Sequence, residues 1–177
     1  MLRTSRLLLL SGSDFFYIIL VRTKKSIYLE TTIPSYATAK PSTDIIVAAR
    51  QLLTNLFWEK ERHKYNLLIS KFVIDECSGG DKEAAQKRLK FISGIEQLEI
   101  PQGVEALAGT YQKILGISDK ARYDCLHLAH CVLGKIDYLL SWNCTHLGNV
   151  TQNKIRNYND SHSLWTPSLV TPEFFTT

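Results

Sequence analysis

Short β-prone runs alternate with longer helical patterns along most of this 177-residue chain, and this order constrains the fold more than any other feature. Four such runs lie at residues 26–29, 67–69, 97–100 and 136–141. Strands that alternate with helices at this spacing favour a parallel sheet with helices on both faces. We therefore predict an α/β fold, a three-layer α/β/α sandwich with a central, mostly parallel sheet of four to five strands. The C-terminal tail is expected to supply the extra edge strand.

Capping residues and apolar periodicity predict helices between these runs. The helices are expected at 45–63, after Ser70, after Asp81, at 104–115 and after Ser118. The first and longest of them carries one apolar face suited to packing, formed by Ile46, Ala49, Leu53, Leu56 and Phe57.

The first 24 residues are expected to lie outside a single domain at 25–177. Gly12 and Asp14 interrupt the apolar residues of this extension, which lacks a signal-peptide cleavage pattern. Its apolar runs are also shorter than the ~20 continuous residues of a membrane span, so no membrane association is expected. The four cysteines have irregular spacing and no Cys-x-x-Cys pair, which favours reduced thiols and a cytoplasmic protein.

Several common functional motifs are absent, which narrows the chemistry. The chain has no Gly-x-Gly-x-x-Gly after a strand, no P-loop and no Gly-x-Ser-x-Gly elbow, so dinucleotide, P-loop and serine-hydrolase chemistry are disfavoured. A zinc site is one alternative, raised by Cys125, His127, His130, Cys131, Cys144 and His146. Only His127 and Cys131 share a helix face at i,i+4, so roles in the core and at the surface are favoured for this set.

Three acidic residues carry the most information about function. Glu30 directly follows the first strand, Glu76 lies in the short helix after the second, and Asp124 lies in the first turns of a later helix. Each is expected near the carboxyl edge of the parallel sheet, where sites form in such folds. Converging carboxylates repel one another, and a hard cation such as Mg²⁺ or Mn²⁺ relieves that repulsion. Taken singly, each acid also has an ordinary structural role as a cap, a helix-dipole partner or a solvated residue.

Four stretches of the sequence resemble the signature motifs of PIN-domain proteins, the fold of the VapBC-type ribonuclease toxins and related nucleases. They are IYLETTIPSY, LLISKFVIDE, YDCLHLAHC and IDYLLSWNCTHLGN, in that order from about Ser26 onward. The resemblance implies a Mg²⁺- or Mn²⁺-dependent endoribonuclease with its acidic cluster at Glu30, Glu76 and Asp124. Asn143 would occupy the position of a fourth acid, so it keeps an acceptor oxygen but lacks the charge. Glu30 is one methylene longer than the usual Asp, so its carboxylate must fold back to reach the same metal.

Other residues are candidates for positioning a substrate. Thr31 and Thr32 could orient a ligand water or a phosphate, or could satisfy backbone groups after the strand. Lys120 and Arg122 are candidates for phosphate contacts at the rim, with solvated surface charge as the alternative. His127 and Trp142 could flank RNA, although a packed Trp beside a strand end is the commoner case.

Two functional hypotheses follow from these features. The first is a metal-dependent endoribonuclease for single-stranded RNA, in one form a toxin restrained by an antitoxin protein. The second is a PIN fold with little or no catalysis that binds RNA or a protein, and Glu30 and Asn143 motivate it. A net charge of +4 and a pI near 8.8 fit RNA as a partner without requiring it. The resemblance also implies a homodimer.

Overall fold

A five-stranded parallel sheet forms the centre of the computed structural model, which describes residues 7–8, 19–20, 24–117, 122–143 and 149–176. Its strands are β3 (Ser26–Leu29), β4 (Asn66–Ser70), β5 (Glu96–Leu98), β6 (Tyr138–Leu140) and β7 (Ser168–Val170). The spatial order is β5-β4-β3-β6-β7, and every neighbouring pair is parallel. The predicted fold class is therefore confirmed, and β7 is the edge strand expected from the C-terminal tail.

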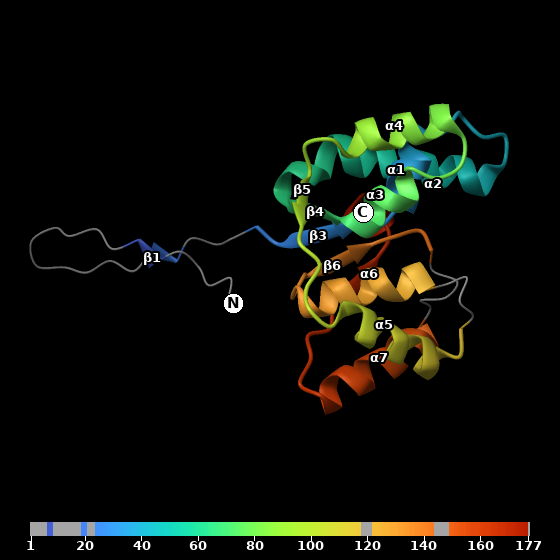
Figure 1. Cartoon of the computed structure of the whole chain (residues 1–177). Helices are drawn as coiled ribbons and strands as arrows, with labels where there is room; N and C mark the ends of the chain where they lie inside the picture. The colour runs from blue at the N-terminus through green and yellow to red at the C-terminus, as the bar shows by residue number, and fades with distance from the viewer. Residues whose placement is uncertain (1–6, 9–18, 21–23, 118–121, 144–148, 177) are drawn as a thin grey trace, which may run out of the picture.

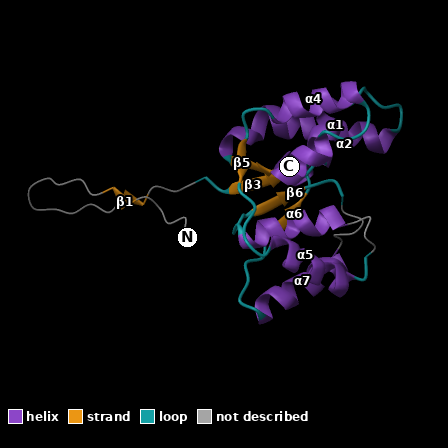
Figure 2. Cartoon of the chain, viewed as in Figure 1, coloured by secondary structure: helices purple, strands orange, loops and turns teal. Residues whose placement is uncertain are grey.

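Helices cover both faces of the sheet (Figures 1 and 2). One face carries α1 (Thr32–Thr38), α2 (Ile45–Leu56) and α4 (Lys82–Ile92), and the other carries α5 (Val104–Leu115), α6 (Arg122–Leu133) and α7 (Asn149–Ser161). The short helix α3 (Lys71–Cys77) follows β4, and α8 (Glu173–Thr176) ends the described chain. Right-handed crossovers explain this division, because the chain moves from β3 through β4 to β5 in one direction across the sheet and from β5 through β6 to β7 in the other.

Three of the residues expected to cap helices do so, and Ser118 lies outside the described residues. Asp44 accepts hydrogen bonds from the backbone N–H groups of Ile46 and Val47 at the start of α2. Ser70 caps α3 and Asp81 caps α4 in the same way. These side chains satisfy backbone donors that the first helical turn leaves without partners, so the boundaries follow from local sequence.

The central strand and α6 form the core that holds the functional edge. All the side chains of Ile27, Tyr28 and Leu29 on β3 are fully buried, as expected for a strand with helices on both sides. Every residue from Asp124 to Val132 on α6 is buried as well. A helix that is buried all round lies between other layers, and α6 lies between the sheet and α5 (Figure 1). Side chains of α6 are therefore fixed by packing.

The apolar face predicted for the helix that begins at residue 45 is confirmed only in part: Phe57 is buried and Leu53 packs against the core, whereas Ile46 and Ala49 are exposed. Ile45, Ile46 and Leu52 are 84%, 63% and 61% exposed, whereas Gln51 and Thr54 are buried. The buried polar residues have partners inside the protein. Gln51 binds the carbonyl of Lys40 and the N–H of Ser42, and Thr54 accepts a hydrogen bond from the indole N–H of Trp142. These hydrogen bonds turn Gln51 and Thr54 inward, against the orientation that the apolar pattern predicts. The helix also ends at Leu56, and a π-helical turn (Phe57–Glu61) and a 3₁₀ turn (Arg62–Lys64) complete the segment.

Ordered contacts with the sheet begin at Lys24 within the described residues. The Lys24 ammonium binds the carbonyl of His63, and the N–H of Asn66 binds the carbonyl of Lys25. Upstream, β1 (Leu7–Leu8) and β2 (Ile19–Leu20) form an antiparallel pair, drawn apart from the five-stranded sheet in Figure 1. Among the helices described, none has the length and apolar character needed to cross a membrane.

Candidate metal and nuclease site

The candidate site lies at the carboxyl edge of the sheet, where the chain changes direction across it. Glu30 directly follows β3, and Ser141, Trp142 and Asn143 follow the adjacent strand β6. The crossover that leaves β3 covers one face of the sheet, whereas the crossover that enters β6 covers the other. Such a switch point opens a crevice beyond the strand ends, and α/β proteins bind ligands there.

Glu30 is buried, and protein donors hold one of its oxygens. Its Oε2 accepts hydrogen bonds from the Thr32 N–H at 3.0 Å, the Thr32 hydroxyl at 2.5 Å and the Ser141 hydroxyl at 2.8 Å. The Thr32 hydroxyl oxygen in turn accepts from the backbone N–H of Trp142 at 2.9 Å. The longer Glu side chain thus folds back over the start of α1, and Thr32 and Ser141 fix its carboxylate.

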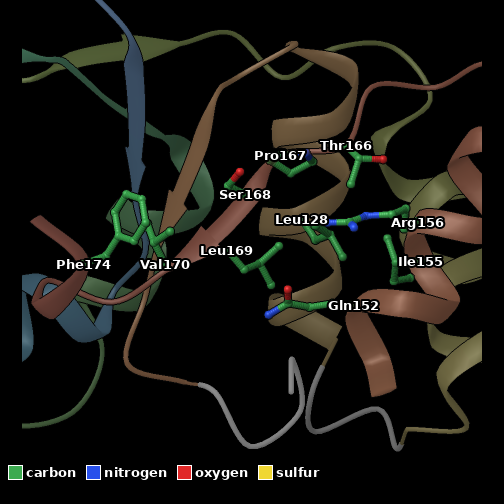
Figure 3. A pocket seen from close by; sticks show the side chains of 10 residues that line it. All are labelled: Leu128, Gln152, Ile155, Arg156, Thr166, Pro167, Ser168, Leu169, Val170 and Phe174. Carbon is green, nitrogen blue, oxygen red and sulfur yellow. The ribbon is translucent and has the colours of Figure 1, made fainter. Parts of the chain in front are cut away.

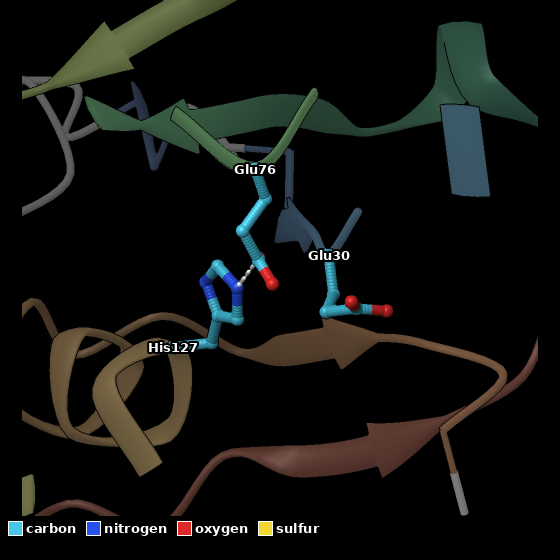
Figure 4. Close-up of side chains that lie close together, drawn as sticks. All are labelled: Glu30, Glu76 and His127. Atoms are coloured by element: carbon cyan, nitrogen blue, oxygen red, sulfur yellow. Dashed lines mark hydrogen bonds and ion pairs between the residues drawn. The ribbon is translucent and has the colours of Figure 1, made fainter. Parts of the chain in front are cut away.

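Glu76 meets His127 beside Glu30 (Figure 4). The Glu76 Oε2 lies 2.7 Å from His127 Nε2 and accepts a hydrogen bond from the Thr31 hydroxyl at 2.6 Å. Partial burial raises the pKa of Glu76, but the hydrogen bonds from His127 and Thr31 outweigh it, so the pKa is lowered overall. Glu76 is therefore a carboxylate at neutral pH, and it joins α3 to α6 and to the start of α1.

Asp124 belongs to the same edge but to a second group of contacts. Its side chain is buried, and its Oδ1 accepts a hydrogen bond from Asn143 Nδ2 at 2.7 Å. The Asn143 N–H donates to the Ser141 hydroxyl oxygen at 2.8 Å, and that hydroxyl donates to Glu30. A continuous hydrogen-bonded path thus connects Asp124 to Glu30 through the loop that follows β6. Asn143 uses its amide N–H₂ here as a donor to Asp124.

Three donor atoms come together at this edge among the described residues. One carboxylate oxygen each of Glu30 and Glu76 and a ring nitrogen of His127 lie within 4.8 Å of one another, and Asp124 is not part of this group. The hydrogen bonds from described residues to Glu30 and Glu76 all end on Oε2. The Oε1 atoms are thus available to a cation. Two carboxylates and an imidazole are ligands that divalent ions accept, so this set fits the metal that the sequence resemblance implies.

Three of the other positions proposed from the sequence, Thr31, Thr32 and Arg122, have clear surroundings. Thr31 and Thr32 bind the carboxylates of Glu76 and Glu30, so their hydroxyls orient the acidic residues. The Arg122 guanidinium pairs with Glu105 of α5, and both side chains are exposed. Lys120 lies outside the described residues.

The alternative zinc set does not assemble among the described residues. Cys125 and Cys131 are buried in the core, and burial raises the pKa of Cys125 to about 12 and that of Cys131 well above its usual value. Of this set only His127 joins a group of potential ligands, and Cys144 and His146 lie outside the described residues.

The sequence reasoning did not place His127 beside the two Glu residues, and it overlooked Ser141. Asp124 and His127 are three residues apart, so they share one face of α6. That spacing was the available signal, because a helix that directs Asp124 to the sheet edge also directs His127 there. Ser141 is the first polar residue after β6. No feature of the neighbouring sequence distinguishes Ser141 from a residue that only forms hydrogen bonds with backbone groups at the end of the strand.

A separate pocket of about 270 Å³ lies between α6, α7 and β7 (Figure 3). Apolar side chains such as Leu128, Ile155 and Leu169 line it, together with the polar Gln152 and Arg156. None of the acidic residues described above contributes to its lining. This pocket and the carboxylate site are therefore different places in the molecule.

Comparisons with known proteins find similar solved structures but no similar sequence. No family model matches the sequence, and no curated protein matches it. One solved structure that is similar is VapBC2 from Rickettsia felis bound to a DNA fragment from their promoter. The matched chain is 18% identical, with a TM-score of 0.47, and the match covers 82% of this chain and 98% of that chain. The functional assignment accordingly depends on the residues of the site and on the sequence motifs.

Proposed function

We propose that this protein is a Mg²⁺- or Mn²⁺-dependent endoribonuclease that cleaves single-stranded RNA. The observation that carries this proposal is the meeting of Glu30 and Glu76, which are distant in sequence, at the carboxyl edge of a parallel sheet. The PIN-like sequence motifs support the same activity and the choice of RNA. The pairing of carboxylates with open Oε1 atoms supports the need for a cation.

Each residue has a defined role in this proposal. Glu30 and Glu76 would hold the cation, and Asp124 and Asn143 would complete the site through their connection to Ser141. A bound divalent ion supplies an activated water and stabilises charge on the phosphoryl group. The hydroxyls of Thr31, Thr32 and Ser141 donate to the carboxylates of Glu76 and Glu30 and keep them oriented.

A cleavage assay on a mixed pool of single-stranded RNAs tests the proposal. The full chain is assayed with Mg²⁺, with Mn²⁺ and with EDTA, beside Glu76→Gln. We expect cleavage only with metal and a loss of at least about 100-fold in the variant, because ligand loss removes both metal affinity and charge stabilisation. Asp75→Asn is the matched control. Asp75 is adjacent in sequence to Glu76 but pairs with Lys71 at the surface, so this variant should cleave like wild type.

The second candidate function is a binding module for RNA or protein. Asn143 favours it, because it stands where the PIN motif often has an acid and donates to Asp124 instead of adding a charge. In that case RNA would bind in the presence of EDTA and would remain intact with every divalent ion. The same assay, followed by a filter-binding measurement on the uncleaved pool, separates the two functions.

The sequence resemblance also supports a toxin restrained by an antitoxin protein. Induced expression in a bacterial host should then arrest growth for wild type and not for Glu76→Gln. Asp75→Asn should arrest growth like wild type. Arrest by the Glu76→Gln variant as well would point to an effect of expression unrelated to cleavage.

A further inference from the structure

His127 has the surroundings of a metal ligand. Its side chain is 1% exposed, and its Nε2 is directed to Glu76, with Glu30 alongside (Figure 4). Packing holds the ring in place, because the rings of Tyr28 and Phe72 lie 5.6 and 6.4 Å away, centroid to centroid. A buried imidazole held in this way reaches the two carboxylates without further ordering of its side chain.

The other ring nitrogen of His127 is bound to an oxygen, as in metal-binding histidines generally. Nδ1 lies 2.8 Å from the Tyr28 hydroxyl, which lies 2.6 Å from the Ser70 hydroxyl, and Ser70 accepts a hydrogen bond from the Phe72 N–H. Without metal, the Glu76 carboxylate needs a donor, so Nε2 carries the hydrogen. Ser70 then donates to Tyr28, and Tyr28 donates to Nδ1. Every group in this chain is satisfied in that arrangement.

The Tyr28 hydroxyl also allows the opposite arrangement. If the hydrogen of the neutral ring is on Nδ1, it is donated to the Tyr28 oxygen, and the Tyr28 hydroxyl turns to donate to Ser70. The numbers of hydrogens and charges are unchanged, and the Nε2 lone pair becomes free to bind an ion. When two ligand atoms each lie about 2.1 Å from one ion and the angle between them at the ion is a right angle, the two atoms are about 3 Å apart. If the cation binds Glu76 through Oε2, which loses the Nε2–H donor in this arrangement, the 2.7 Å contact between Nε2 and Oε2 has to widen by only a few tenths of an ångström. Oε1 accepts no hydrogen bond from a described residue, so binding through Oε1 displaces none.

We propose that His127 Nε2 is a ligand of the cation beside Glu30 and Glu76, and that the site therefore prefers Mn²⁺ to Mg²⁺. This inference rests on the proposed metal-dependent function and specifies the metal of the same site. Mg²⁺ is bound almost entirely by oxygen, whereas an imidazole nitrogen suits the first-row transition ions. A mixed set of two carboxylates and one imidazole thus discriminates between the two ions, which an all-carboxylate set does weakly.

Pulsed electron paramagnetic resonance of the Mn²⁺-loaded full chain tests the ligand directly. Wild type should show the modulation of a directly coordinated ¹⁴N nucleus, and labelling histidine with ¹⁵N should change it. His127→Gln should abolish the ¹⁴N signal. Tyr28→Phe is the matched variant, because it keeps the ring nitrogen and removes only its hydroxyl partner, so the signal should persist. Bound Mn²⁺ without nitrogen coupling in wild type, or coupling that survives in His127→Gln, overturns the proposal.

Isothermal titration gives the metal preference. In His127→Gln the dissociation constant for Mn²⁺ should rise at least tenfold, and that for Mg²⁺ should change by less than threefold. Equal changes for both ions would overturn the inferred preference. The ¹⁵N experiment on wild type decides the ligand even if a variant folds poorly. RNA cleavage with no nitrogen coupling would retain the nuclease and reject the ligand. Nitrogen coupling with no cleavage would retain His127 as a ligand and reject the nuclease.

Discussion

At the scale of single residues, the site depends on hydroxyl groups that orient carboxylates. Thr31, Thr32 and Ser141 each donate to an acid, and each lies next to the end of a strand that positions it. Hydrogen bonds to a charged oxygen are stronger than those between neutral groups, so the acids are fixed before any metal binds. The same bonds keep a metal-free site folded. Changes to individual acids should thus affect activity far more than folding.

Asp124→Asn should abolish cleavage and leave the metal-free protein folded. An amide at this position keeps an oxygen that can accept the hydrogen bond from Asn143, but it removes one negative charge from the edge of the sheet. We expect cleavage to fall by at least about 100-fold, with a melting temperature equal to or slightly above that of wild type. RNA cleavage and circular dichroism measure the two effects. Full activity in this variant would show that Asp124 is dispensable.

Asn143→Asp should have the opposite effect on the metal-free protein. It replaces the donor to Asp124, 2.7 Å away, by a second carboxylate, so a hydrogen bond becomes a like-charge contact. We expect a loss of about 1–3 kcal/mol in the free energy of unfolding without metal. Mn²⁺ should restore more stability to this variant than to wild type, because ligand binding to the folded state stabilises it. Thermal melts with and without Mn²⁺ measure this difference, and equal shifts would contradict it.

At the scale of elements, α6 carries two residues of the site, Asp124 and His127, and also an unusual buried residue, His130. His130 lies one turn after His127, is fully buried, and has no hydrogen-bond partner for either ring nitrogen in the described structure. Burial, with a smaller contribution from His127, lowers the pKa of His130 to about 4. A neutral ring is therefore required in the folded state, whereas the unfolded chain binds a proton near pH 6.5.

His130 should make the protein sensitive to acid in a definite range. Because its pKa is lowered on folding, its effect on stability is absent above about pH 6.5 and grows as the pH falls to about 4. A shift of the His130 pKa from 6.5 to about 4 corresponds to a loss of about 3 kcal/mol in the free energy of unfolding. His130→Leu should remove this loss, and at pH 7.5 it should be at least as stable as wild type, because two buried unsatisfied nitrogens are removed. Urea unfolding across pH 4–7.5 measures it.

The exposed His63 provides the control for that experiment, since His63→Leu should keep the acid sensitivity of wild type. If His130→Leu lost stability between pH 6.5 and 4 as steeply as wild type, another group would have to be responsible. Circular dichroism at each pH verifies that both variants begin folded.

The elements were largely predictable from the sequence, whereas several contacts between them were not. Caps such as Asp44 and Asp81 and the apolar runs are local signals, so they placed most helices and strands. Helix α1, which begins within the polar residues after β3, was not foreseen, nor was α7 in the tail. The face of α2 depends on hydrogen bonds of Gln51 with the loop before the helix and of Thr54 with Trp142, which is distant in sequence. The pairing of Glu76 with His127 arises in the same way, from the packing of α3 against α6.

At the scale of the whole molecule, the overall charge and the charge of the site have opposite signs. The protein carries a net charge of +4, which attracts a polyanion, while Glu30, Glu76 and Asp124 repel phosphate at the sheet edge. A divalent cation bound between the carboxylates would cancel most of this negative charge and would offer phosphate oxygens a ligand position. RNA affinity should therefore be higher with Mn²⁺ than with EDTA for a non-cleavable RNA analogue, and Glu76→Gln should reduce this difference. Fluorescence anisotropy measures it, and metal-independent affinity would contradict the coupling.

The sequence resemblance predicts a homodimer, and α2 offers a face for it. Ile45, Ile46 and Leu52 form an exposed apolar group on this helix, and such groups commonly mark interaction surfaces. Sedimentation velocity at micromolar concentration should give the mass of two chains. Leu52→Lys should shift that equilibrium toward one chain with little change in the unfolding of the monomer, because Leu52 is exposed there. A wild-type monomer would reject the dimer, and an unaffected dimer would place the contact elsewhere.

Removing residues 1–23 should leave the folded domain almost unchanged. Ordered contacts with the sheet begin at Lys24 and Lys25 among the described residues, and the apolar residues of β3 begin at Ile27. We expect the melting temperature of the shortened chain to lie within about 2 °C of the full chain, because a ΔΔG of 1 kcal/mol moves a domain of this size by roughly 2–4 °C. A deletion that continues through Ser26 is the control. Ser26 donates from its N–H and its hydroxyl to Asp137, so its loss should lower the melting temperature clearly. A large drop on removing 1–23 alone would show that the extension belongs to the core.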